Sequence, residues 1–63
     1  MEILLISKRA NDGKVSEQRK SIDQEKIKAF VEGCDMVLKT GLILGYCIKD
    51  AKTNEVLVKK GTI

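Results

Sequence analysis

Two segments of the chain are apolar on both faces of the strand that each one predicts. The first is Met1–Ile6, with the sequence MEILLI, and the second is Leu42–Ile48, with the sequence LILGYCI. Successive side chains of a strand point to opposite faces, so an unbroken apolar run places hydrophobic groups on both sides of a sheet. A sheet built from these two segments therefore needs cover on both faces.

One amphipathic helix is predicted between the two apolar segments. Asp23 is a suitable N-cap, Gly41 is a suitable C-terminal stop, and Ser21 with Gln24 forms an alternative capping box that would start the helix two residues earlier. A single helix covers only one face of a sheet, so the other face predicts a partner. The helical stripe consists of apolar residues three and four positions apart: Ile27, Phe30, Val31, Cys34, Val37 and Leu38.

A hairpin is predicted before the helix. Glu2–Arg9 reads as the first strand, and Asn11–Gly13 supplies residue types that accept the positive φ of a tight turn. Lys14–Lys20 is polar apart from Val15 and reads as a returning edge strand, with an ordered loop as the alternative.

A second hairpin is predicted after the helix. Leu42–Lys49 and Glu55–Lys60 read as strands joined by the loop Asp50–Asn54. If Asp50 faces Glu55, then Ile48 faces Leu57 and Tyr46 faces Lys59; a slip of one residue would exchange the faces. The sequence therefore predicts a single α+β domain over residues 1–63, in the order ββαββ, with a four-stranded antiparallel sheet and one helix packed across one face.

Chain length and composition favour self-association. A domain of 63 residues buries only about 60% of its unfolded surface and is marginally stable alone. Two cysteines, and an N-terminal segment unlike a secretion signal or a membrane span, predict a cytoplasmic protein with reduced thiols rather than a disulfide framework. We therefore expect a homodimer, and no membrane association.

The sequence assigns residues to the two sheet faces only through the guessed register. One alternating set, which includes Leu4, Ile6, Leu44, Tyr46 and Ile48, is expected to meet the helix. The opposite set is expected to form the self-association surface: Ile3, Leu5, Ile43, Cys47, Val56 and Val58.

No residue pattern indicates catalysis, a metal or a cofactor. The chain has no histidine and no glycine-rich phosphate loop, and its acidic residues fall in expected caps, turns and the polar helix face. Cys34 and Cys47 could approach each other in the core as a redox pair, but their spacing is not that of a metal site and packing as small hydrophobes is the favoured interpretation. We expect a non-enzymatic protein.

Binding to another protein is the favoured function, as a small regulator whose target the sequence does not identify. Docking of the helical stripe into a partner is one route to it. A nucleic-acid-binding protein is the alternative, although the net charge of +3 is modest for that class. It would use cations in and beside the two hairpins: Lys8, Arg9, Lys14, Arg19, Lys20, Lys49, Lys52, Lys59 and Lys60.

Overall fold

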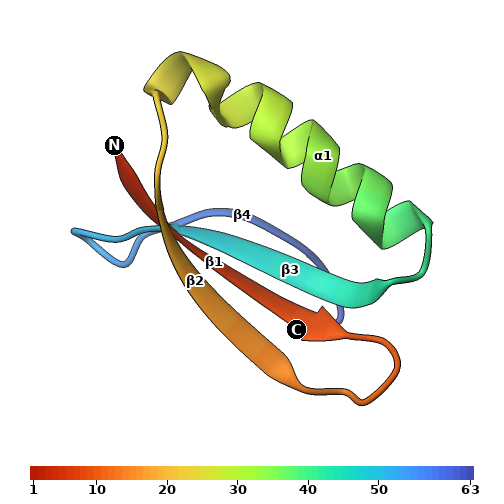
Figure 1. Cartoon of the computed structure of the whole chain (residues 1–63). Coiled ribbons are helices and arrows are strands. Elements are labelled where there is room, and N and C mark those ends of the chain that lie inside the picture. Colours follow the sequence, from red (N-terminus) through yellow and green to blue (C-terminus); the bar gives the residue numbers. More distant parts are fainter.

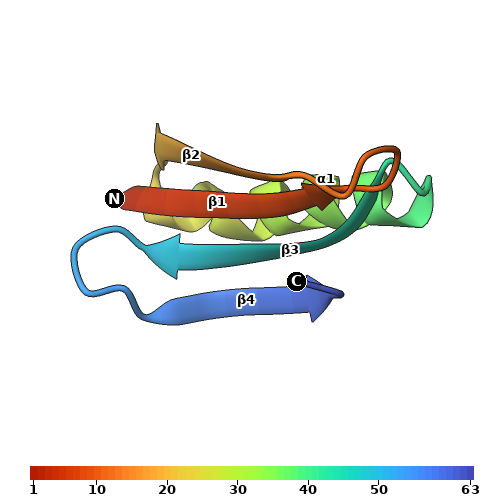
Figure 2. The same ribbon diagram turned by 90° about the horizontal axis from the view of Figure 1, so that it is seen from below.

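The computed structural model describes residues 1–63 as a four-stranded antiparallel sheet with one helix on it (Figure 1). The strands stand in the order β2-β1-β3-β4, and Figure 2 looks onto the sheet with the helix on its far face. This arrangement confirms the predicted α+β class and the ββαββ order. The elements are β1 (Glu2–Arg9), β2 (Val15–Ser21), α1 (Ile27–Lys39), β3 (Ile43–Asp50) and β4 (Val56–Gly61).

The helix begins differently from the prediction. A 3-10 turn, η1 (Gln24–Lys26), precedes α1, and the Lys26 amide donates a hydrogen bond to the Asp23 carbonyl at 2.8 Å. The Asp23 side chain makes no capping hydrogen bond, so the expected capping by its carboxylate is wrong. The backbone carbonyl of Asp23 accepts the hydrogen bond of this turn instead. At the other end Gly41 has φ +82°, a conformation that glycine adopts at little cost, and it ends the helix as predicted.

The core lies between α1 and the sheet. Ile3, Tyr46 and Ile48 have no exposed surface, which makes the two central strands the floor of the core. Fully buried side chains are few because the chain is short. Around them pack the partly buried hydrophobic residues Leu5, Ile22, Phe30, Val31, Cys34, Leu38, Ile43 and Val58.

In the second hairpin, the pairing of β3 with β4 beyond the connecting loop differs by one residue from the predicted register. The amide of Asp50 does bond to the Glu55 carbonyl at 2.9 Å, but the register shifts between Ile48 and Lys49, so Ile48 faces Val58 rather than Leu57. An extra residue in one strand of an antiparallel pair moves every later side chain to the other face. Val58 therefore joins Ile48 beneath the helix.

The expected division of the sheet faces is wrong for four of the six residues assigned to self-association. Ile3, Leu5, Ile43 and Val58 belong to the core or pack against it. The reason is the pairing of the central strands, which places Leu5 opposite Ile48 and therefore on the same face of the sheet.

The opposite, outer face of the sheet carries a shorter apolar strip. The apolar side chains of β1 on this face are those of Leu4 and Ile6, and Ile6 pairs with Cys47 of β3. Leu4 and Ile6 were expected beneath the helix, whereas the observed register turns them away from it. Of the six expected self-association residues, only Cys47 and Val56 lie on this face.

Two glycines let the ends of β3 and β4 come together. Gly45 pairs with Gly61, and the amide of Thr62 donates to the Leu44 carbonyl at 2.9 Å. A Cβ atom on Gly45 would lie 2.6 Å from the backbone nitrogen of Thr62, closer than real Cβ contacts allow. The edge strand β4 therefore depends on a backbone approach that only glycine permits.

We expect Gly45→Ala to lower the free energy of unfolding by about 2 kcal/mol, within the range for overpacking, because the added methyl group meets backbone atoms. Gly33→Ala is the matched control. A Cβ at Gly33 meets nothing within 4 Å, so this change should stabilise the helix by about 0.5–1 kcal/mol. Urea unfolding midpoints measure both; equal midpoints would contradict the close approach of β3 and β4.

Candidate functional site: an apolar groove beside the helix

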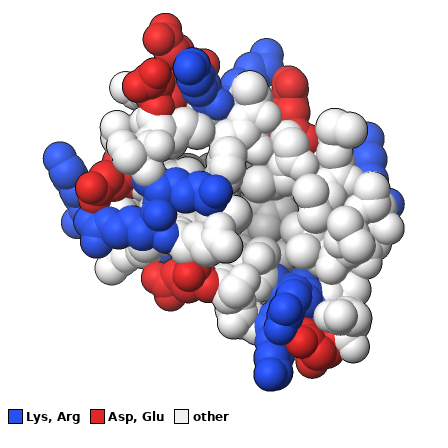
Figure 3. Space-filling view, in the orientation of Figure 1, with Lys and Arg blue, Asp and Glu red and all other residues white.

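An open groove runs between α1 and the sheet. Its volume is about 390 Å³, and seven of its nine lining residues are hydrophobic. Figure 3 shows it as an uncharged hollow in the middle of this face of the molecule, with basic atoms on its left and lower borders and acidic atoms close beside them. Leu5, Ser7, Ile43 and Tyr46 come from the sheet, whereas Ala29, Phe30, Gly33, Cys34 and Val37 come from the helix.

The groove exists because the helix is fastened along its other side. The Tyr46 hydroxyl donates a hydrogen bond to Asp35 Oδ1 at 2.5 Å, and Lys60 Nζ lies 2.9 Å from Asp35 Oδ2. These contacts join α1 to β3 and β4, and the closest approach of the helix to the sheet is to β3. The helix edge that faces β2 has no such contact and stands open.

The protonation states of this contact are fixed by its surroundings. The hydrogen bond from Tyr46, followed by that from Lys60, holds the pKa of the Asp35 carboxyl below its usual value. Burial, followed by the hydrogen bond to Asp35, raises the pKa of Tyr46 well above its usual value. Tyr46 therefore stays a neutral donor and Asp35 a charged acceptor across the neutral range.

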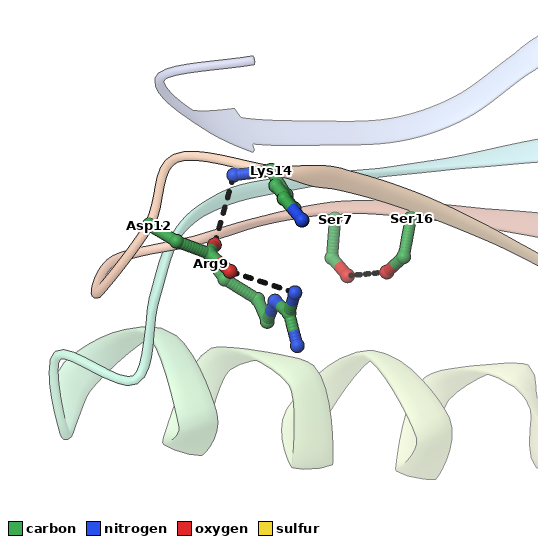
Figure 4. Close-up of polar contacts among 5 residues, drawn as sticks. All are labelled: Ser7, Arg9, Asp12, Lys14 and Ser16. Carbon is green, nitrogen blue, oxygen red and sulfur yellow. Dashed lines mark hydrogen bonds and ion pairs between the residues drawn. The ribbon is translucent and has the colours of Figure 1, made fainter.

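Polar side chains of the first hairpin form one end of the groove's mouth. Figure 4 shows the side chains of Ser7, Arg9, Lys14 and Ser16 directed toward the helix side of the hairpin. The Ser7 and Ser16 hydroxyl oxygens are 3.2 Å apart. Arg9 Nη2 lies 2.7 Å from Asp12 Oδ2, which neutralises this arginine. Lys14 makes no ion pair, so its charge is free.

The helix-facing side of β2 continues this rim. Ser16 pairs with Ser7, Gln18 with Leu5 and Lys20 with Ile3, which places all three on the groove side. Lys20 Nζ lies 5.8 Å from the centroid of the Phe30 ring, at a distance typical of a cation–π contact. From one end of β2 to the other, this rim carries a cation at each end, neutral hydrogen-bonding groups between them, and no carboxylate.

The helical rim of the groove carries charges of both signs. Residues three and four positions apart share one side of a helix, so Lys26, Glu25 and Glu32 all stand beside the exposed Ala29. Asp35 lies on the opposite side of α1, where it meets Tyr46 and Lys60. The groove therefore combines an apolar lining with a positively charged border along β2 and a border of mixed charge along α1.

Apolar surface extends from the groove to the end of α1. Met36 is 69% exposed and Leu42 is 67% exposed, and Val37, which lines the groove, is also exposed. Together with exposed Leu44, they account for half of the eight large hydrophobic residues that the protein exposes. Met36, Val37 and Leu42 therefore add exposed apolar surface near the C-terminal end of α1.

The outer face of the sheet has a smaller hollow of about 240 Å³. Cys47 is buried there, Ile6 is half-buried and Val56 is exposed. The side chain of Ile63 lines the same hollow, so part of this face is covered by the chain itself. The need for a partner on this face is smaller than the sequence suggested.

The two cysteines lie on opposite faces of the sheet and do not form the redox pair that remained possible from the sequence. Cys34 lines the groove under the helix, whereas Cys47 lines the hollow on the outer face. Burial and the neighbouring charge of Asp35 raise the pKa of the Cys34 thiol, which lowers the fraction of reactive thiolate.

The cations of the nucleic-acid alternative are distributed over both faces. Three of the nine are in ion pairs: Arg9 with Asp12, Arg19 with Glu2, and Lys60 with Asp35. Lys20, by its strand register, and Lys14, as drawn in Figure 4, belong to the groove side, whereas another three, Lys8, Lys49 and Lys59, belong to the outer face. The ninth, Lys52, lies in the loop between β3 and β4.

Comparisons with known proteins give no relative: no family model, no curated protein and no solved structure matches the chain. No group of three or more histidine, cysteine or acidic side chains is placed to hold a metal ion. No helix combines the length and apolar character required to cross a membrane.

Sequence reasoning did not find the groove. The available signal was the pair Ala29 and Gly33, small residues one helical turn apart beside the large Phe30. Small side chains at this spacing leave space beside the helix. Whether other side chains fill that space depends on where the helix lies over the sheet. That position is set by the contact of Asp35 with Tyr46 and Lys60, which joins residues far apart in the sequence.

We expect tyrosinate to form only when the protein unfolds. Tyr46 is the only tyrosine, so its absorbance during alkaline titration reports this side chain alone. Its folded pKa is raised above the ordinary value of 10.0, so its stabilising effect is complete below that pH and is lost as pH rises above it. The absorbance should therefore rise together with loss of the circular dichroism of the fold.

The control for this titration is Tyr46→Phe, which removes one hydrogen bond to Asp35. The carboxyl pKa of Asp35, followed by NMR, should rise toward its ordinary value because the largest cause of its lowering is gone. Tyrosinate appearing near pH 10 in a protein that is still folded would show that Tyr46 is not held as described.

Proposed function

We propose that the protein is a non-enzymatic protein-binding domain, a small regulator that receives a segment of its partner in the groove between α1 and the sheet. The observation that carries this proposal is the open groove, which has a volume of about 390 Å³ and a mostly apolar lining. Its volume is within the range of known binding pockets. We also propose a cytoplasmic location, in keeping with two unpaired cysteines.

The lining supports binding because its exposed apolar surface does not stabilise the free protein. Ala29, Gly33 and Val37 are all exposed on the helix edge, and a side chain larger than hydrogen at Gly33 would enter empty space. Insertion of apolar side chains from a partner would remove this surface from water, at about 25 cal/mol for each Å² buried. Recognition by a groove beside a helix is a common mode of peptide binding.

Self-association is a second proposal, on a different surface. The strip formed by Leu4, Ile6, Cys47 and Val56 on the outer face would be covered by the same strip of a second copy in a two-fold dimer. The charges around it are mixed, with Glu17 opposite Ile6 on β2 and Lys59 opposite Cys47 on β4. Such a pattern allows opposite charges to meet across a two-fold axis.

The nucleic-acid alternative receives less support from the arrangement of the cations. A phosphate backbone is bound by unpaired cations that follow one continuous path, whereas the free lysines here are divided between two faces. No observation favours it over binding to a protein.

Groove binding is tested with an uncharged amphipathic peptide that carries leucines at helical spacing and glutamines elsewhere. We expect it to shift the backbone NMR signals of Leu5, Ala29 and Gly33 because these residues line the groove. Gly33→Leu should remove binding while the protein stays folded, since its side chain would fill the groove and leucine is the better helix former.

The matched control is Glu32→Leu, which adds the same apolar side chain to an exposed helix position outside the lining. This variant should keep the binding of the parent protein. Absence of binding to the parent protein at millimolar peptide, or equal binding by Gly33→Leu, would contradict the groove as the binding site.

Self-association is tested by light scattering over a concentration series. We expect Ile6→Lys to convert a dimer into a folded monomer, because a charge in the middle of the outer strip would be buried at the interface. Met36→Lys, at an exposed helix position, should leave the mass unchanged. A parent protein that is monomeric at all concentrations would show that the outer strip is no interface.

A further inference from the structure

We infer that the segment bound in the groove is acidic and amphipathic, with apolar side chains directed into the lining and carboxylates placed over the cations at both ends of β2. This inference rests on the proposed function and names the chemistry of its partner. It follows from the charge of the strand rim rather than from the volume of the groove.

The strand rim carries two positive charges that no acidic residue of the protein neutralises. Lys14 and Lys20 stand at opposite ends of the groove side of β2, and neither has a carboxylate within ion-pair distance. Lys20 Nζ lies over the ring of Phe30, a wall of the groove. The neutral Ser16 and Gln18 between them leave hydrogen-bonding groups for the polar backbone or side chains of a ligand.

The helical rim carries charges of both signs. Lys26 lies three residues before Ala29, but Glu25, four residues before it, and Glu32, three residues after it, share that side of the helix by the same spacing. On the strand side of the mouth, the carboxylate of Asp12 is already bound to Arg9. A basic segment would therefore meet repulsion from Lys14 and Lys20 along the strand rim, whereas an acidic one would meet unpaired cations there.

The spacing of the cations sets the length of the segment. Lys14 and Lys20 are six residues apart along a nearly extended strand, which corresponds to about 20 Å at a rise of about 3.3 Å per residue. A helical ligand of about 13 residues spans the same distance at 1.5 Å per residue. Its carboxylates would then lie near its first and last turns, with an apolar stripe between them.

The test uses three synthetic peptides of 14 residues with the same leucine stripe. They carry glutamate, glutamine or lysine at the positions beside the stripe near both ends. We expect the acidic peptide to bind the parent protein roughly five- to tenfold more tightly than the neutral one, from two or three exposed charge pairs. The lysine peptide should bind more weakly than either, and added salt should remove the difference.

The decisive variant is Lys14→Glu combined with Lys20→Glu, which should reverse the preference between the acidic and basic peptides. Lys49→Glu combined with Lys59→Glu makes the same change in net charge on the outer face and should leave the preference unchanged. Both protein pairs are compared with the same peptides by isothermal titration calorimetry.

The outcomes separate this inference from the proposed function. Equal binding of all three peptides in the groove, blocked by Gly33→Leu, would overturn the acidic partner and leave the groove as a protein-binding site. Binding of none would overturn both. A dimer that Gly33→Leu dissociates would make a second copy of the chain the occupant. A short single-stranded DNA that displaces the acidic peptide would assign the rim cations to phosphate binding.

Discussion

The contact of Asp35 with Tyr46 and Lys60 determines how the single helix lies on the sheet. A helix is about 10 Å wide and adjacent strands are about 4.8 Å apart, so one helix covers about two strands of four. The hydrogen bond from Tyr46 and the ion pair with Lys60 hold α1 by the side that faces β4. On the opposite side the helix makes no hydrogen bond or ion pair to the sheet and meets only Lys20 over the ring of Phe30, and the groove follows from this asymmetry.

The composition of β2 agrees with that geometry. All seven of its residues are exposed, including those on the side that faces the helix. A strand beneath the helix would carry hydrophobic residues there, as Ile3 and Leu5 do on β1, whereas Ser16 and Lys20 suit a surface in contact with water. The border between covered and uncovered strands is where apolar lining and free cations meet, and this border is the candidate site.

The sequence predicted the elements well because local signals specify them. The strands follow from apolar runs and turn residues, the helix follows from apolar spacing, and Gly41 marks its end. The assignment of faces failed because it depends on pairing between distant strands and on the irregularity between Ile48 and Lys49. The groove could not be predicted at all, since it depends on the lateral position of the helix. No local pattern in the sequence encodes that position.

Gly33 is the strongest reason to regard the groove as a site rather than a packing defect. Glycine within a helix costs about 1 kcal/mol relative to alanine, and the empty space beside it would accept a larger apolar side chain. Leucine at this position would improve helix formation and remove exposed apolar surface at the same time, so stability alone favours filling the groove. Departures from local stability rules tend to occur at functional sites. An open groove between unpaired lysines is consistent with a surface kept free for a partner.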